Sequence, residues 1–393
     1  MIIDEIDSVH GLVKLESEWR ALQNEVGTLP FTSWEWNVAW WRNLSRHSLT
    51  KADRLFVRAF RSPRGELLGV APLMITELPA RGIRLRCLRY FGADPNITEI
   101  RGPLIRPSCE VEVYESLLQH VFGRAREWDC VMLDGIRADS EAVPILKRFG
   151  QPLWTTDVPD FTLTLPKTWE QFRSSRSRNI KESLRKCVNS LKRDGIEATH
   201  RVATHGPELQ TAIRAFLELH AARSNRTDTV RHGNVFESTN AAGFLRELEE
   251  RCASTRSFMA FSMEIAAKAV AVRLAFPVGR SLYLYYSGYD PQYGQYSVMT
   301  NVVAEAIKYA IAEGYEIVNL STGNDVSKTR WSPDEVTFRQ AVLPSGAIHA
   351  RFATAGFLRL RKFWQSRMAV VPAASTPDRG TEPTGTSRGE RNR

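Results

Sequence analysis

Six tyrosines gather in a short stretch of the second half of the chain, where a predicted strand runs into a loop. They are Tyr283, Tyr285, Tyr286, Tyr289, Tyr293 and Tyr296. Packing is the ordinary role of any single tyrosine in such a place. As a group they could do more, because a phenol can donate a proton to a departing thiolate.

The loop after that strand has the form of an anion-binding turn. It begins near Gly288, contains Gly294, and leads into a predicted helix that starts near Ser297. A helix amino terminus approached through a glycine-containing turn offers free backbone N–H groups to a phosphate. Many α/β connections look like this, so the spacing alone is a weak signal.

A basic segment, residues 173–193, precedes this region. It holds eight lysines and arginines and a single acid, Glu182. Ile180, Leu184 and Leu191 recur at helical spacing, which predicts an amphipathic helix with most of its charges on the other face. Two interpretations stay open. The charges form a solvated helix face, or they are a landing surface for a phosphate-bearing substrate, an anionic membrane or RNA.

Composition narrows the class of protein. The five cysteines are scattered without a C-x-x-C pair, which disfavours a disulfide framework or a zinc site and favours a reducing compartment. The chain has no H-E-x-x-H or G-x-S-x-G motif and no histidines at metal-ligand spacing, so we expect no metal and no hydrolase. The net charge of +9 attracts phosphates in general without choosing among them.

The sequence also lacks the patterns expected of a membrane-spanning helix or a signal peptide. No apolar run reaches the ~18 residues that a spanning helix needs, and the acidic first ten residues are unlike a signal peptide. These features predict a cytoplasmic protein. Its 393 residues leave room for two domains of ordinary size.

The predicted elements form two mixed-sheet α/β units. Strands over 54–60, 66–75, 130–133 and 161–165 and helices over 113–124 and 141–149 make the first. Strands over 196–202, 257–264, 269–276, 281–289, 317–320 and 336–342 and helices over 208–223 and 297–313 make the second. We predict domains at 1–165 and 166–365. Residues 366–393 are predicted to be a disordered tail, because they become rich in Pro, Thr, Ser, Gly and Arg.

The amino-terminal segment is predicted to be helical. Apolar residues recur at helical spacing over 9–25, which predicts one amphipathic helix. Thr32, followed three residues later by Glu35, predicts a capping box that opens a second helix with Trp36 and Trp40 on one face.

Four stretches resemble one family, the cellulose-biosynthesis-type acetyltransferases of the GNAT superfamily of N-acyltransferases. Residues 31–41 (FTSWEWNVAWW) look like its amino-terminal aromatic segment, and residues 178–195 look like its basic linking helix. Residues 286–291 (YSGYDP) resemble the end of its cofactor-side strand, and residues 319–331 (NLSTGNDVSKTRW) resemble its closing motif. The last two stretches are the most specific ones.

This resemblance implies two GNAT units in tandem. The second unit would bind acetyl-CoA or another acyl-CoA and pass the acyl group to an amine. The candidate cofactor-binding residues are Ser287, Gly288, Tyr289, Gly294, Gln295, Ser297 and Val298. Lys328, Arg330 and Trp331 fall where the family closes its site, which makes them candidates for substrate binding.

The leading hypothesis is acyl transfer from acyl-CoA to a small amine, with an amino sugar for surface polysaccharide as the suspected acceptor. The enzyme would hold thioester and amine together, polarise the carbonyl with strand N–H groups and protonate the leaving thiolate. Tyr289 and Tyr286 are the candidate acids, and Asp325 is a candidate base. Lys328 or Arg330 would hold anionic groups of the substrate.

Two alternatives stay open. The basic segment motivates a transferase that uses aminoacyl-tRNA, as in the Fem-type peptidoglycan enzymes, which share the tandem architecture; otherwise nucleic acid is not an expected partner. Val298, Met299 and Asn319 stand where the family has Pro, Gly and Asp, and they motivate a catalytically degenerate scaffold for polysaccharide assembly. Peripheral contact with an anionic membrane is compatible with the charge. The first unit has no phosphate-loop candidate, so we expect it to be structural or to bind the acceptor.

Overall fold

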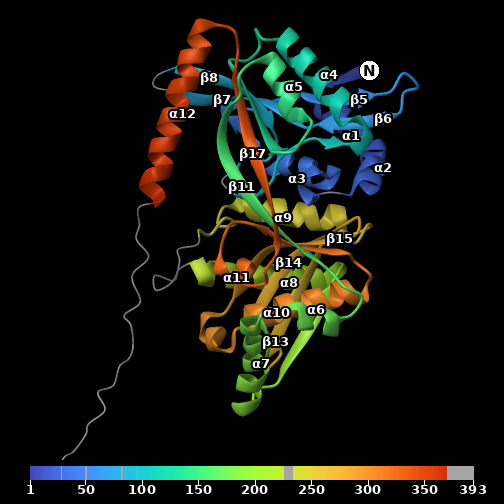
Figure 1. The fold of residues 1–393 in the computed structure, drawn as a ribbon, viewed down its shortest axis with the longest axis vertical. Helices are drawn as coiled ribbons and strands as arrows, with labels where there is room; N and C mark the ends of the chain where they lie inside the picture. The colour runs from blue at the N-terminus through green and yellow to red at the C-terminus, as the bar shows by residue number, and fades with distance from the viewer. Residues whose placement is uncertain (28, 49–50, 81–82, 95, 225–232, 370–393) are drawn as a thin grey trace, which may run out of the picture.

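Two α/β units lie one above the other and share one mixed sheet (Figure 1). The computed structural model describes residues 1–27, 29–48, 51–80, 83–94, 96–224 and 233–369. Within these ranges the shared sheet has eleven strands, in the order β12-β13-β14-β15-β16-β11-β17-β10-β8-β7-β4. Of the predicted tail, residues 366–369 lie in the last helix, and residues 370–393 lie outside the described residues.

The first unit contains both a part of the shared sheet and a smaller sheet of its own. Its elements are β1 (Ile2–Ile6), α1 (Val9–Lys14), α2 (Glu16–Val26), η1 (Pro30–Thr32), α3 (Trp34–Leu44), β2 (His47–Ser48), β3 (Lys51–Ala52), β4 (Arg54–Leu55), β5 (Val57–Arg61), β6 (Leu67–Ala71), β7 (Leu73–Ala80), β8 (Ile83–Tyr90), β9 (Leu104–Ile105), η2 (Pro107–Cys109), α4 (Glu110–Gly123), β10 (Cys130–Arg137) and α5 (Ala142–Phe149). The smaller sheet has the order β1-β5-β6-β9, and β2 pairs with β3.

The second unit supplies the other half of the shared sheet. Its elements are β11 (Leu153–Thr164), α6 (Trp169–Ser175), α7 (Arg178–Arg193), β12 (Ala198–Ala203), α8 (Gly206–Ser224), α9 (Thr239–Cys252), β13 (Met259–Ile265), β14 (Lys268–Val278), β15 (Ser281–Tyr289), η3 (Pro291–Tyr296), α10 (Val298–Ala312), β16 (Ile317–Thr322), α11 (Val326–Thr329), β17 (Asp334–Pro344) and α12 (Ile348–Ala369). The helices α8 and α10 pack against β14 and β15 and bury their apolar side chains there.

Two long strands tie the units together. β17 pairs with β10 of the first unit and with β11, while β11 pairs in turn with β16 of the second unit. Both strands run from one unit into the other in Figure 1. β17, the last strand among the described residues, therefore completes the sheet of the first unit, so the two units share strands and are not consecutive independent domains.

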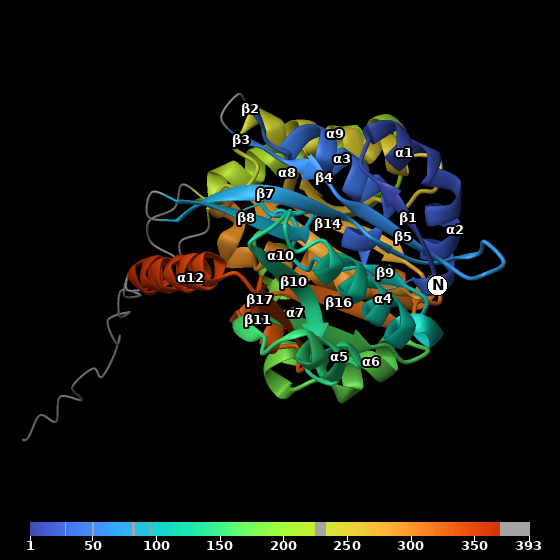
Figure 2. The ribbon, with the colours of Figure 1, turned by 90° about the horizontal axis from the view of Figure 1, so that it is seen from above.

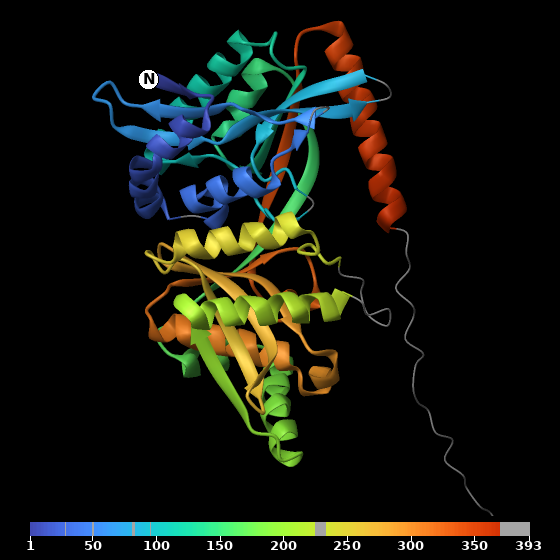
Figure 3. The same cartoon turned by 180° about the vertical axis from the view of Figure 1, so that it is seen from behind.

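Packed helices close the boundary between the units on the other side. Figure 3 shows α3 of the first unit lying directly against α9 of the second. Trp36 on α3 and Phe244 on α9 meet edge to face with 5.0 Å between their ring centroids. Both are buried in one apolar cluster that also takes in Phe276 and Tyr285. A continuous apolar core therefore holds the units in a defined relation.

The last helix returns to the first unit. α12 runs beside β7 and β8, as Figure 2 shows from above. It follows β17, whose carboxyl end already lies next to β10. Side chains of α12 can therefore take part in a site on the first unit, although they lie about 200 residues or more from it in sequence.

Two local predictions at the amino terminus are wrong. The helix predicted over 9–25 is interrupted at Leu15, which ends α1 and precedes α2. Ser33 caps α3, since its hydroxyl accepts a hydrogen bond from the Trp36 amide at 3.2 Å. Thr32 is the last residue of the 3₁₀ turn that begins at Pro30, so it cannot cap α3. Glu35 forms an ion pair with Arg20 at 3.1 Å and does not take part in a capping box. The proline shifts the helix start by one residue and removes the capping box.

Candidate active site

Two parallel strands part at the centre of the second unit. β15 and β16 pair only over Ser281–Tyr283 and Ile317–Asn319, and their remaining lengths have other neighbours. On its other side β15 bulges against β14, so that Tyr285 and Tyr286 stand opposite a single residue. A bulge bends the strand that carries it and leaves its extra residue unpaired. The result is an opening between β15 and β16 beyond Tyr283 and Asn319, next to the bulge of β15.

A cavity of about 280 Å³ lies at this opening, and α10 begins in its wall. We call it the donor cavity. Ser297, which precedes α10, adopts a left-handed conformation with φ of 51°. Among the described residues, the amides of Val298 and Met299 have no hydrogen-bond acceptor, and the first turn carries no acid. An anion placed there would receive two backbone N–H groups and the positive end of the helix dipole.

A larger cavity of about 590 Å³ lies against the same opening and is lined by both units. We call it the acceptor cavity. It shares Arg223, Arg273, Ser287, Ser327 and Lys328 with the donor cavity. The two cavities therefore meet at the parted strands. A thioester in one and an amine in the other would come together there.

Glu99 is the acidic residue that the first unit contributes to this junction. It lies in the connection between β8 and β9 and lines the acceptor cavity. Its Oε2 accepts a hydrogen bond from the Tyr283 hydroxyl at 2.5 Å. Burial raises the pKa of Glu99 to about 7, against the opposing effect of the Lys328 charge. The carboxyl group is thus balanced between its acid and base forms near neutral pH.

Two cations face this carboxyl group. Arg273 on β14 donates through Nη2 to the carbonyls of Leu284 at 2.9 Å and Leu320 at 3.4 Å, which belong to the two parted strands. Lys328 donates to the carbonyl of Thr322. Burial lowers the pKa of Arg273 to about 10 and also lowers the pKa of Lys328. Neither has a carboxylate within 4 Å in the described part of the chain, so both stay available to developing negative charge.

Asn319 holds the end of β16 in place. Its Nδ2 donates to Asp160 on β11 at 2.7 Å, and its Oδ1 accepts from the Ser321 amide at 2.7 Å. Burial raises the pKa of Asp160 to about 6. An aspartate at 319 would place a second carboxylate next to Asp160. The departure from the family pattern at this position therefore suits the neighbour that this chain has.

The structure brings most of the predicted cofactor residues together and separates two of them. Ser287, Tyr289, Gly294, Ser297 and Val298 line the donor cavity, as do Lys328 and Trp331. Gln295 instead lines a hollow formed with α7. Gly288 packs under α8, where an added Cβ would lie 2.5 Å from the His220 amide nitrogen.

The other predicted site residues lie as follows. Tyr289 has no hydrogen-bond partner for its hydroxyl among the described residues, whereas the Tyr286 hydroxyl donates to the Asn96 carbonyl at 2.9 Å. Asp325 lines the acceptor cavity and caps α11. Burial acts to raise the pKa of Asp325, but hydrogen bonds from Ser327 and the nearby Lys328 charge hold it below its ordinary value. Arg330 donates to the Ser183 hydroxyl of α7 and lines neither cavity.

Sequence reasoning missed Glu99 and Arg273. Glu99 lies in an irregular connection, and its partners are about 180 residues or more away in the chain. Arg273 left a usable signal, because it is a single charge inside the apolar run Val270–Phe276 of β14. A buried strand rarely carries an arginine without a function or a partner.

The basic helix lies beside the donor cavity. The Cys187 thiol of α7 donates to the Ser297 carbonyl at 3.7 Å, and the Tyr296 hydroxyl donates to Asp194 at 3.0 Å. Three exposed cations of α7 border a hollow next to η3, namely Arg185, Lys186 and Arg193. Their charges extend the positive region that begins at the amino terminus of α10.

Two features that bear on function are absent from the described residues. No group of three or more His, Cys, Asp or Glu side chains there is placed to hold a metal ion. In the same ranges, every helix is too short or too polar to cross a membrane.

Comparison with known proteins identifies the architecture. A model of the acetyltransferase (GNAT) domain family matches residues 177–329, which lie in the second unit. The structure is similar to that of FemX, with a TM-score of 0.60, 11% identity, and coverage of 86% of this chain and 97% of the other. It is also similar to L-PGS from Bacillus licheniformis, with a TM-score of 0.51, 12% identity, and coverage of 89% and 96%.

A protein of unknown function from Bacteroides thetaiotaomicron is similar as well, with a TM-score of 0.52, 11% identity, and coverage of 87% and 100%. The comparison with curated proteins found no match. At these identities the likeness shows the fold. The predicted tandem GNAT fold is confirmed, with a GNAT domain in the second unit, and the likeness to the cellulose-biosynthesis branch stays a prediction.

Proposed function

We propose that this tandem GNAT chain transfers an acyl group from acyl-CoA to a primary amine at the junction of its two cavities. One observation carries the proposal. The unpaired amides at the start of α10 open onto one side of the parted strands, and Glu99 lies on the other side. The amides at the start of α10 suit the pyrophosphate of CoA, and Glu99 suits an amine that must lose a proton.

The residues divide the work of the reaction. The nitrogen of the neutral amine forms a bond to the acyl carbon, and Glu99 takes the proton that this nitrogen loses as the bond forms. Backbone N–H groups at the bulge of β15 and the cations Arg273 and Lys328 stabilise the oxygen that becomes negative. As the bond between carbon and sulfur breaks, Tyr289 donates its proton to the thiolate. Asp325 is the weaker candidate for the base, because its lowered pKa reduces its affinity for a proton.

Calorimetric titration with acetyl-CoA tests the donor site. Thr300 lies in the first turn of α10 and lines the donor cavity. Thr300→Asp adds a negative charge beside the proposed pyrophosphate position, while it suits the helix itself. Thr300→Asn has nearly the same shape without the charge. We expect binding by the Asp variant to be weaker by about tenfold or more, with the Asn variant close to the unchanged protein.

Equal binding by both variants would move the donor away from α10. Absence of acetyl-CoA binding in the unchanged protein, repeated with longer acyl-CoAs, would overturn the proposal. It would leave the aminoacyl-tRNA and scaffold functions to be tested.

The aminoacyl-tRNA donor is the second candidate, and the position of α7 supports it. Exposed cations next to the start of α10 could follow a nucleic-acid backbone as well as they could meet the phosphates of CoA. Arg185→Glu with Lys186→Glu should abolish tRNA binding if this candidate is right, and binding should fall steeply with salt. An absence of tRNA binding at low salt would exclude it.

The acceptor and the setting of the reaction are also proposals. A small amine fits a cavity of about 590 Å³, and an amino sugar is the acceptor that we would try first. Use in surface polysaccharide synthesis follows from the family resemblance. The free cysteines suit a reducing compartment, so we place the reaction in the cytoplasm.

A further inference from the structure

A second group of charged and polar side chains lines the acceptor cavity on the side of the first unit. It consists of Arg101 and Asp134 of the first unit and of Thr156, Gln340 and Arg361 from β11, β17 and α12. We call it the arginine end of the cavity. None of these residues has a role in the acyl-transfer steps proposed above. The group exists only because β11, β17 and α12 return to the first unit.

Gln340 is the centre of this group. Its side chain is buried, its Nε2 donates to Asp134 Oδ1 at 2.7 Å, and its Oε1 accepts from Arg361 Nη1 at 2.6 Å. Arg361 Nη2 donates to the Thr156 hydroxyl at 3.1 Å. Arg101 lies 3.6 Å from Asp134 and donates to the Asp94 carbonyl at 3.1 Å. The arrangement fixes both guanidinium groups beside the cavity.

The charges at the arginine end do not balance. Asp134 is one carboxylate, whereas Arg101, Arg361 and the neighbouring Arg89 are three guanidinium groups whose charges act on one another. The hydrogen-bond partners of Arg361 are neutral oxygens, and no carboxylate lies within 4 Å of it or of Arg89 in the described ranges. The Nε of Arg89 is buried without a hydrogen-bond partner. Burial lowers the pKa of Arg361, and the Arg101 charge adds to this effect.

Other arginines of the first unit are paired with carboxylates. Arg61 is paired with Asp4 and Glu18, and Arg106 is paired with Glu25 and Glu66. A surplus of cations that line a cavity is costly unless an anion enters. Guanidinium groups bind carboxylates and phosphates through two parallel hydrogen bonds.

We infer that the arginine end binds an anionic group, a phosphate or a carboxylate, carried by the same molecule that presents the amine to Glu99. This inference rests on the proposed function for the amine and adds the chemical class of the acceptor. The first unit then selects the acceptor by its charge, while the second unit supplies the donor site. A neutral amine would reach Glu99 without this anchor and bind more weakly.

Binding measurements without any acyl donor test the inference separately from catalysis. The probes are inorganic phosphate and pyrophosphate, together with two pairs of amines whose members differ in one anionic group: glucosamine 6-phosphate with glucosamine, and alanine with alaninamide. Arg361→Gln removes the guanidinium. Arg359→Gln is the control, because Arg359 is exposed on the same helix and lines neither cavity. Arg361→Lys keeps the charge and loses the paired hydrogen bonds.

We expect at least one anionic probe to bind the unchanged protein and the Arg359→Gln variant tenfold or more tightly than its neutral counterpart. Arg361→Gln should remove that preference, and Arg361→Lys should keep part of it. The phosphate pair and the carboxylate pair show which anion the site takes. The inference is overturned if no anion binds, or if binding by Arg361→Gln stays within twofold of the control.

Titration of each variant with acetyl-CoA and its thermal unfolding complete the test. Unchanged acetyl-CoA binding with loss of anion binding assigns the effect to the acceptor end. If the unchanged protein does not bind acetyl-CoA, the proposed function fails. The measurement of anion binding at the arginine end is not affected by that outcome. If Arg361→Gln fails to fold, the affinities of the Arg361→Lys variant and the Arg359→Gln control for the anionic probe are compared. Equal affinities would count against the inference.

Discussion

The two units contain the same arrangement of a parallel strand pair joined through a helix, and they fill it differently. β8 and β10 pair over three positions, as β15 and β16 do. In the second unit the strands part around a cavity, and α10 begins without acids. In the first unit Tyr90, the next residue after the paired segment of β8, is buried close to Tyr114 of α4. The first turn of α4 also carries two acids, Glu110 and Glu112.

Under the proposed function, one backbone frame serves two purposes in the two units. An open gap and an acid-free helix start let backbone amides meet an anion in the second unit. Buried phenols and acids at the helix start exclude an anion from the corresponding place in the first unit. The first unit instead offers side chains to the shared acceptor cavity, Glu99 and Arg101 among them. We therefore expect the first unit to act on the acceptor and never on the donor.

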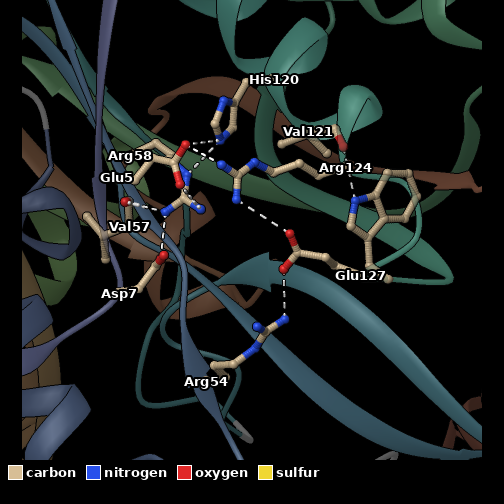
Figure 4. A network of polar contacts seen from close by, with 10 residues as sticks. Glu5, Asp7, Arg54, Val57, Arg58, His120, Val121, Arg124 and Glu127 are labelled. Atoms are coloured by element: carbon tan, nitrogen blue, oxygen red, sulfur yellow. Dashed lines mark hydrogen bonds and ion pairs between the residues drawn. The ribbon is translucent and has the colours of Figure 1, made fainter.

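Two buried arginines show the same contrast at the level of single side chains. Arg58 of the first unit is fully buried and donates to Asp7 at 2.8 Å and to His120 at 2.9 Å (Figure 4). Its guanidinium group also lies over the Phe56 ring. Arg273 of the second unit is also buried but donates to backbone carbonyls. A paired buried charge belongs to the structure, whereas one without an acid belongs to a site.

The largest expected effect is on Glu99, the residue of the first unit that enters the reaction. Glu99→Gln removes the base and should lower kcat by about 10²- to 10⁴-fold. In the unchanged protein the rate should rise with pH through about 7 as Glu99 loses its proton, and the variant should lack this step. Steady-state kinetics between pH 5.5 and 9 give both results.

Stability separates loss of the base from misfolding. The folded-state pKa of Glu99 is raised from 4.5 to about 7, so the folded state holds the extra proton and loses stability as pH rises through this window. Glu99→Gln should therefore be more stable than the unchanged protein at pH 8 by about 1–3 kcal/mol. Asp325→Asn is the matched carboxylate control, with an expected loss of rate below about tenfold. A larger loss there would make Asp325 the base.

The next effect distinguishes the two arginines. Arg273→Met should lower the turnover rate by about 10²-fold, while it changes the free energy of unfolding by less than about 1 kcal/mol, since the charge that it removes is buried without an acid. Arg58→Met should cost about 1–3 kcal/mol of stability and leave the rate per folded molecule unchanged. Denaturant titration and kinetics of both variants decide the matter. Equal losses of stability would show that Arg273 is also structural.

The prediction from sequence succeeded where the chain is locally regular. Strands β13, β14 and β15 and the helix α10 follow periodic apolar patterns, and the turn before α10 carries glycine and aromatic residues that mark it. The same signals predicted many of the residues that line the donor cavity. They act within about 20 residues, which is the range over which hydrophobic periodicity is informative.

The acceptor side could not be predicted because long-range pairing builds it. Glu99 meets Tyr283 only through the packing of the two units, and Arg361 reaches Gln340 only because α12 turns back along β8. No periodic pattern records which sheet edge a late strand or helix will join. Arg273, a lone arginine in the apolar strand β14, was the one local sequence feature that indicated the acceptor side.

A smaller effect concerns the structural network of the first unit. Burial and the charges of Arg58 and Arg124 lower the pKa of His120, so the unfolded state takes up a proton first and stability falls as pH drops below about 6.5. His120→Gln keeps a hydrogen-bond acceptor for Arg58 and should reduce this loss by about 1 kcal/mol. The exposed residue His10 gives the control variant His10→Gln. Unfolding curves at pH 5 and pH 7 measure the difference, and equal slopes in all three proteins would contradict the assignment.

The smallest effect tests whether acids alone keep the donor out of the first unit. Glu110→Gln with Glu112→Gln removes both charges from the start of α4 and should cost about 0.3–1 kcal/mol for each lost interaction with the helix dipole. We expect no second acetyl-CoA site, because the buried phenols of Tyr90 and Tyr114 still fill the gap between β8 and β10. Calorimetry is done with Thr300→Asp in the same chain, which weakens binding at the donor cavity, so any binding beyond that of Thr300→Asp alone must come from the first unit. Such binding would show that charge, and not the filled gap, separates the two units.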